Sequence, residues 1–196
     1  MEIFKLTKSK TREKILQFFF ADAEKKYYLR QLERILDLPV ANIRRELLSL
    51  EKSGLFKREK MGNQVYYFVN KESPIFEEFK KIVSKTIGVE GLLKKELKKI
   101  VKIKLAFIYG SFAKEKEDSF SDIDLMIIGS PDEDELISKI SKLESQFARE
   151  INYNIFSVED FKKGLAKGEV FLKEILKNQK IFIIGAQNDL EKIIGK

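Results

Sequence analysis

Two short apolar segments, and the polar residues that adjoin them, constrain the fold of this chain more than any other feature. The segments 105–109 and 123–128 are rich in Ile, Leu, Phe and Met, and each is bounded by glycine. Both are therefore predicted to be buried strands. A Gly-Ser pair (Gly110 and Ser111) follows the first strand, and an acidic pair lies at the start of the second. The chain is thus expected to bring a tight turn next to two carboxylates.

The acidic pair consists of Asp122 and Asp124, whose spacing of two places both side chains on the same face of a strand. Two ionised carboxylates on one face repel each other unless a cation lies between them. Hard oxygen ligands suit Mg²⁺, with Mn²⁺ as an alternative, and Mg²⁺ takes further ligands from substrate phosphates. The turn at Gly110 and Ser111 offers backbone N–H groups and a hydroxyl to a phosphate. Together the two pairs predict a site for a metal-bound nucleoside triphosphate (NTP).

This arrangement resembles the DNA polymerase β-like nucleotidyltransferase superfamily, in particular its minimal nucleotidyltransferases. The residues that carry the resemblance are Gly110-Ser111-Phe112-Ala113 and Ser121-Asp122-Ile123-Asp124-Leu125. The resemblance covers the chain from Leu105 onward and implies a small mixed sheet flanked by helices. It also implies Mg²⁺ on the acidic pair, the triphosphate near the Gly-Ser pair, and transfer of a nucleoside monophosphate to an acceptor. A protein is one candidate acceptor.

Active members of that superfamily usually carry a third carboxylate on a later strand, whereas this chain has an amide there. The matching strand is expected over 151–156, where apolar residues alternate with Asn152 and Asn154. Asn152 stands at the third catalytic position if this strand pairs beside Asp124. Because an amide does not take a proton at neutral pH, two functions stay open. The protein either retains transfer or is a DNA-binding transcriptional regulator whose reduced nucleotidyltransferase domain senses nucleotides.

Composition excludes several kinds of chemistry. The 196 residues contain no Cys and no His, which excludes disulfides, thiolate catalysis, histidine-based proton transfer and zinc fingers. No apolar segment has the length of a membrane span, and the N-terminal residues do not have the pattern of a signal peptide. We therefore expect a cytoplasmic protein.

Charge is distributed unevenly along the chain. Residues 1–70 contain 15 Lys and Arg against 9 Asp and Glu, whereas residues 105–196 contain 13 against 17. The net charge of +7 thus arises in the first half of the chain. Such asymmetry predicts a polyanion-binding module that precedes a module of another kind.

Residues 1–72 are predicted to form a winged helix-turn-helix domain. Helices are expected over 7–21, 29–36 and 39–53, followed by strands over 55–60 and 64–69 around a tight turn. This order resembles regulators whose third helix enters the major groove of double-stranded DNA. The residues predicted to contact DNA are polar or basic and lie on the third helix and the hairpin: Asn42, Arg44, Arg45, Ser49, Lys57, Arg58 and Lys60. The alternative is a protein–protein module with a solvated basic surface.

The rest of the chain completes an α+β protein. Residues 73–104 are predicted to form a helical connector whose apolar stripes belong to the domain core or to a homodimer interface. Residues 105–196 are predicted to form the nucleotidyltransferase-like domain. Its further elements are expected to be a helix over 132–147, a helical segment over 161–177 that breaks at Gly168, and a strand over 181–184.

Overall fold

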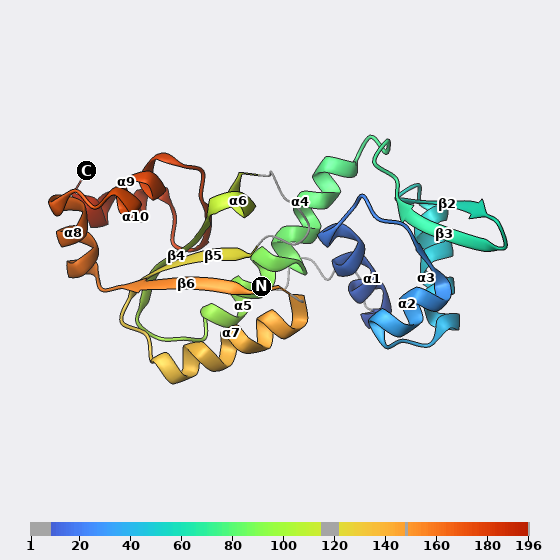
Figure 1. The fold of residues 1–196 in the computed structure, drawn as a ribbon, viewed down its shortest axis with the longest axis horizontal. Coiled ribbons are helices and arrows are strands. Elements are labelled where there is room, and N and C mark those ends of the chain that lie inside the picture. Colours follow the sequence, from blue (N-terminus) through green and yellow to red (C-terminus); the bar gives the residue numbers. More distant parts are fainter. Residues whose placement is uncertain (1–8, 115–121, 148, 196) are drawn as a thin grey trace. The chain divides into compact units, whose positions relative to one another are not determined.

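The chain forms two compact units, Met1–Gly88 and Val89–Lys196 (Figure 1). The structure is a computed structural model that describes residues 9–114, 122–147 and 149–195. The expected start of the first helix at Thr7 and the motif residue Ser121 lie outside the described residues. Each unit has its own hydrophobic core. Both units contain helices and strands, which confirms the α+β class expected from the sequence.

The first unit combines helices with a small antiparallel sheet of strand order β1-β3-β2. Its elements are α1 (Lys10–Ala21), β1 (Tyr27–Tyr28), α2 (Leu29–Leu36), α3 (Val40–Lys52), β2 (Phe56–Met61), β3 (Gln64–Val69) and α4 (Phe76–Thr86). Large buried side chains from α1, α3 and β2 meet in the core, among them Phe19, Ile43 and Phe56. Phe76 and Val83 of α4 join the same cluster. The first half of the expected connector therefore packs within this unit.

Local sequence signals explain where these elements begin and end. The Ser9 side chain caps α1 by accepting a hydrogen bond from the backbone N–H of Arg12 at 3.3 Å. Asp37 adopts the left-handed conformation and ends α2. The sequence predicts Pro39 as the first residue of the next helix, but it lies one position earlier, as the N-cap of α3. Gly62 has φ +59° in the two-residue turn between β2 and β3, a conformation that glycine adopts readily.

The second unit contains a mixed four-stranded sheet of order β6-β5-β4-β7. Its elements are α5 (Val89–Leu97), β4 (Ile103–Tyr109), α6 (Gly110–Ala113), β5 (Ile123–Gly129), α7 (Glu133–Phe147), β6 (Ile151–Phe156), α8 (Val158–Lys167), α9 (Val170–Lys177), β7 (Ile181–Ile184) and α10 (Gln187–Ile194). Strands β5 and β6 are parallel, and the other neighbours are antiparallel. The two apolar segments that dominate the sequence are the central strands.

Helices cover both faces of this sheet (Figure 1). One face carries residues such as Leu125 and Ile127 and packs against α5 and α7. The opposite face carries Phe107 and Met126 and packs against α8, α9 and α10. Because side chains alternate between the faces, Asp124 shares the second face with Met126. The acidic pair therefore lies at one end of the face that α8 to α10 cover.

The sequence predicts most elements of this unit and misses a few. Strands β6 and β7 have the expected bounds. The break expected at Gly168 in the helical segment 161–177 is confirmed, because Gly168 adopts a left-handed conformation between two helices, α8 and α9. Helix α8 begins earlier than expected, after Ser157, whose side chain accepts from the N–H of Asp160 at 3.0 Å. Among the described residues, no helix has the length and apolar character needed to cross a membrane.

Candidate active site

Three strands place polar side chains in one row across the second sheet. Asp124 of β5 pairs with Tyr109 of β4 on one side and with Asn152 of β6 on the other. Residues directly paired across a sheet share a face, so these three side chains point the same way. Asn152 therefore pairs beside Asp124, which is the condition under which the sequence places it at the third position. Asp122 immediately precedes β5 and extends the polar row beyond the strand.

The two carboxylates differ in their surroundings. Asp122 is exposed, and its Oδ2 accepts a hydrogen bond from Nδ2 of Asn152 at 3.2 Å. Asp124 is half-buried. Burial raises the pKa of the Asp124 carboxyl above its ordinary value, and the negative charge of Asp122 adds to this effect. A bound cation would offset both costs, since its positive charge would be coordinated by the carboxylate oxygens.

Gly110 lies directly against the Asp124 carboxylate. Its φ is +76°, and a Cβ at this position would collide with Oδ2 of Asp124. Only a residue without a side chain brings the backbone so close to the acid. Gly110 also begins the short helix α6, where the sequence predicts only a turn. The exposed Ser111 follows on that helix, so the Gly-Ser pair and the acidic pair adjoin as predicted.

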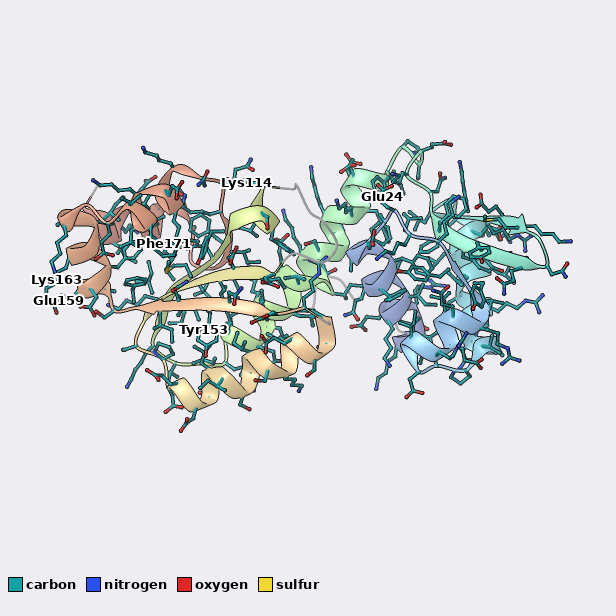
Figure 2. The ribbon with its side chains drawn as sticks, viewed as in Figure 1. Glu24, Lys114, Tyr153, Glu159, Lys163 and Phe171 are labelled. Carbon is teal, nitrogen blue, oxygen red and sulfur yellow. The ribbon has the colours of Figure 1, made fainter. Side chains whose placement is uncertain are left out.

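An aromatic pair also borders the polar row, and sequence reasoning missed its role. The Tyr109 hydroxyl accepts a hydrogen bond from Nδ2 of Asn154 at 2.9 Å, which reaches across β5. Burial raises the Tyr109 pKa, the Asn154 hydrogen bond opposes this change, and the nearby Asp124 charge adds to it. The Tyr109 ring packs edge-on against Phe171 of α9 at a centroid distance of 6.0 Å. Figure 2 shows Phe171 on the α9 side of the sheet, whereas Tyr153 projects toward α7. The sequence signal that could have indicated this role is the position of Tyr109 immediately before Gly110.

Lys180 secures the end of α9 near the same end of the sheet. It precedes Ile181, which pairs with Ile108 of β4. Its ammonium group donates to the carbonyl oxygens of Leu176 at 2.8 Å and of Asn178 at 2.7 Å. Burial lowers the Lys180 pKa, while these C-terminal carbonyls favour a cation. The residue thus caps the C-terminal end of α9, whereas Phe171 lies in the first turn of this helix.

The donor set at the acidic pair fits a hard divalent cation. Asp122 and Asp124 supply carboxylate oxygens, and Asn152 offers an amide oxygen when its amide group is rotated. Across residues 9–114, 122–147 and 149–195, no group of three or more His, Cys, Asp or Glu side chains is arranged to hold a metal ion. A cation on this pair would therefore take further ligands from water or substrate phosphates, which is the usual habit of Mg²⁺.

The residues predicted to contact DNA are mostly accessible on the first unit. Arg44 and Arg45 of α3 and Lys60 of β2 are exposed, whereas Asn42 is half-buried. The apolar side of α3 faces the core through Ile43 and its helical neighbours. The two arginines therefore lie on the outer side of this helix.

Three other predicted DNA contacts have partners within the protein. The Ser49 hydroxyl accepts a hydrogen bond from the Arg12 guanidinium at 2.9 Å. Lys57 pairs with Glu72 at 2.5 Å, and Arg58 pairs with Glu51 at 2.9 Å. Sequence spacing did not reveal these partners, because each is distant in the chain or on another element. A polyanion that used these side chains would have to replace the internal partners.

Comparison with known proteins identifies the second unit. Residues 92–188 match the family model described as Polymerase beta, Nucleotidyltransferase. This unit therefore has a nucleotidyltransferase-like fold, which confirms the family resemblance for the C-terminal part of the chain. A search among curated proteins found no match.

Several solved structures resemble part of the chain. One is a toxin-antitoxin complex with AMP-PNP, at 20% identity and TM-score 0.40, with 54% of this chain and 81% of that chain covered. Another is a variant of the toxin-antitoxin MntA-HpeT, at 18% identity and TM-score 0.41, with coverages of 55% and 82%. A third is the tri-AMPylated Shewanella oneidensis HEPN toxin in complex with MNT antitoxin, at 18% identity and TM-score 0.34, with coverages of 54% and 81%.

Proposed function

We propose that the second unit binds a Mg²⁺-NTP and transfers its nucleoside monophosphate to a hydroxyl group of an acceptor, with a protein as the acceptor class. One observation carries this proposal. The backbone of Gly110 lies against the carboxylate of Asp124, so the turn that we propose to bind phosphates adjoins the pair that we propose to bind the metal. The match of residues 92–188 to a nucleotidyltransferase family supports the same activity.

Each residue has a distinct part in the proposed reaction. Asp122 and Asp124 would hold Mg²⁺, and the N–H groups and hydroxyl of Gly110 and Ser111 would hold the β- and γ-phosphates. When bound, the metal neutralises charge on the phosphates and on the leaving group. The acceptor oxygen forms a bond to the α-phosphorus, and the bond from that phosphorus to the oxygen bridging to the β-phosphorus breaks. Pyrophosphate leaves, and the acceptor proton passes to water.

Asn152 favours a second candidate function. Its amide donates to Asp122 beside Asp124, where a third carboxylate would help to deprotonate the acceptor. A protein that lacks this base can still bind Mg²⁺-NTP, because the acidic pair and the Gly-Ser pair are both present. In this case the domain acts as a nucleotide sensor of a transcriptional regulator.

The first unit supports both functions if it binds DNA. We propose that it is a winged helix-turn-helix domain that places α3 in the major groove and the β2-β3 hairpin on the phosphate backbone. The element order α1-β1-α2-α3-β2-β3, the antiparallel sheet and the exposed Arg44 and Arg45 support this assignment. The basic excess of residues 1–70 provides attraction for a polyanion.

Calorimetric titration of the protein with each NTP in the presence of Mg²⁺ tests the nucleotide site. We expect saturable binding that the double variant Asp122→Asn/Asp124→Asn loses. The variant Glu133→Gln/Asp134→Asn removes the same charge from exposed positions in the first turn of α7 and serves as the matched control. Absence of binding by the unmodified protein, or equal loss in both variants, would refute the proposed site.

Measurement of pyrophosphate release separates the enzyme from the sensor. The enzyme releases pyrophosphate when incubated with Mg²⁺-NTP and an acceptor protein, and the Asp122→Asn/Asp124→Asn variant does not. The sensor binds the nucleotide and changes its affinity for DNA, without release of pyrophosphate.

A further inference from the structure

Phe171 is a large aromatic residue that the core of the second unit does not enclose. Its side chain is 42% exposed in the first turn of α9, and the preceding Val170 is 77% exposed. The next residue, Leu172, is fully buried beneath the same helix. Helix α9 thus anchors itself through Leu172 while it leaves an aromatic ring in solvent. The exposed part of the ring brings no gain in folding, because its apolar surface stays in water.

The surroundings of Phe171 place its ring next to the acidic row. Its centroid is 6.0 Å from that of Tyr109, with an angle of 79° between the ring planes. Tyr109 is directly opposite Asp124 on the neighbouring strand, where paired residues are about 5 Å apart. Phe171 therefore lies one side chain beyond the site that would hold the phosphates and the metal.

The contacts of Tyr109 keep this arrangement fixed. The Tyr109 hydroxyl is held by Asn154, and the Tyr109 ring also contacts Phe107 at a centroid distance of 6.5 Å. An edge-on contact occupies one side of Phe171 and leaves much of the ring free for another planar group. The ring is thus a partly exposed aromatic surface that packs against a tyrosine held in place by Asn154.

We propose that Phe171, supported by Tyr109, stacks on the nucleobase of the NTP whose phosphates lie at Gly110 and Asp124. The inference rests on the proposed nucleotide site and extends it to the base. In an NTP, a ribose separates the base from the α-phosphate. When the phosphates lie beside the acidic pair, the base therefore lies about one side chain away from that pair. A stacking platform without hydrogen-bonding groups accepts every base, since each base has a π-face. The expected substrate class is therefore any NTP, with purines bound more tightly because their rings are larger.

Binding of Mg²⁺-NTP and Mg²⁺-tripolyphosphate to a Phe171→Ala variant tests this proposal. Tripolyphosphate has no base, so it measures the phosphate and metal contacts alone. We expect the variant to bind ATP at least about fivefold more weakly than the unmodified protein while its affinity for tripolyphosphate is unchanged. A Phe171→Tyr variant keeps the ring and should keep the affinity for ATP.

Ile137→Ala provides the matched control. Ile137 lies on α7, which covers the opposite face of the sheet, and its side chain is 48% exposed. This variant should bind both ligands as the unmodified protein does. Equal affinity of the Phe171→Ala and unmodified proteins for ATP would overturn the stacking role and leave the proposed nucleotide site intact. Equal weakening of ATP and tripolyphosphate binding by Phe171→Ala would also overturn the stacking role, since the effect would then be structural. Failure of the unmodified protein to bind either ligand would overturn the site and the platform together.

Discussion

Gly110 and Asp124 are in contact although thirteen residues separate them in the chain. The backbone of Gly110, at φ +76°, lies so near Oδ2 of Asp124 that an added Cβ would collide with this oxygen. The first residue of α6 thereby meets the second strand of the central pair. This contact joins the two halves of the sequence motif into one site. It also explains physically why the first position of the Gly-Ser pair is a glycine.

We expect a Gly110→Ala substitution to abolish Mg²⁺-NTP binding. The added methyl group displaces the Asp124 carboxylate, and the positive φ costs about 1 kcal/mol or more of stability for a residue with a Cβ. Gly54→Ala is the matched control, because Gly54 has φ +77° with nothing within 4 Å of an added Cβ. Calorimetric titration with ATP should show binding by the control and none by Gly110→Ala. Equal affinities of the two variants for ATP would contradict the proposal that the contact with Asp124 requires glycine at position 110.

We expect an Asn152→Asp substitution to increase pyrophosphate release, if the unmodified protein transfers slowly. The new carboxylate would stand beside Asp124 in the parallel register and could accept the acceptor proton. The same substitution at Asn154 places a carboxylate one row away, beside Met126, and should give no gain. The rates of pyrophosphate release by both variants decide the matter. A folded, nucleotide-binding Asn152→Asp protein without faster release would contradict the assignment of Asn152 to the third position.

We expect an Arg44→Ala/Arg45→Ala variant to bind double-stranded DNA about tenfold more weakly or worse. Both arginines are exposed on α3, the helix proposed to enter the major groove. Because the variant removes two positive charges from the proposed interface, the slope of log affinity against log salt concentration should also fall, by at most about 1 for each charge. Fluorescence anisotropy over a series of salt concentrations measures both effects. The variant Lys81→Ala/Lys85→Ala removes the same charge from α4, and an equal loss there would show that only net charge matters.

We expect the first unit to become less stable as the pH decreases, because Glu46 becomes protonated. This carboxylate is 6% exposed and accepts hydrogen bonds from the Ser9 hydroxyl at 2.8 Å and the Arg12 guanidinium at 2.7 Å. Burial by itself would raise the Glu46 pKa, but these hydrogen bonds and the charges of Arg12 and Arg45 lower it overall. Because the folded pKa lies below the unfolded one, the stabilisation is present above the ordinary glutamate pKa and is lost as pH falls through the folded pKa.

A Glu46→Gln variant checks this dependence. It should lower the unfolding free energy by about 1–2 kcal/mol at about pH 7, and the difference from the unmodified protein should shrink as the pH falls below the ordinary glutamate pKa. Urea unfolding followed by circular dichroism at several pH values measures the difference. Glu77→Gln alters an exposed glutamate of α4 and should change little. A difference that stays constant over the whole range would show that ionisation of Glu46 does not contribute.

Much of the candidate site could be predicted because its parts are short and local. The Gly-Ser pair follows an apolar strand, and the spacing of Asp122 and Asp124 puts both on one face. The alternation in 151–156 predicted a strand with the bounds of β6, whereas its pairing with β5, which places Asn152 next to Asp124, came from the structure. The contact of Phe171 with Tyr109 could not be predicted, because it depends on how α9 packs over the sheet.

By itself, the sequence determined the periodic elements and the chemical groups available to them. Apolar residues spaced for a helix predicted α2, alternation predicted β6, and Ser157 supplied a capping side chain for α8. Only the tertiary structure decided which distant groups meet: Gly110 with Asp124, Arg12 with Glu46 and Ser49, and Tyr109 with Asn154. It also formed the two-residue strand β1, which pairs with β3. The physical reason is that a local pattern fixes the direction of a side chain relative to its own backbone, whereas its partner depends on packing and strand register.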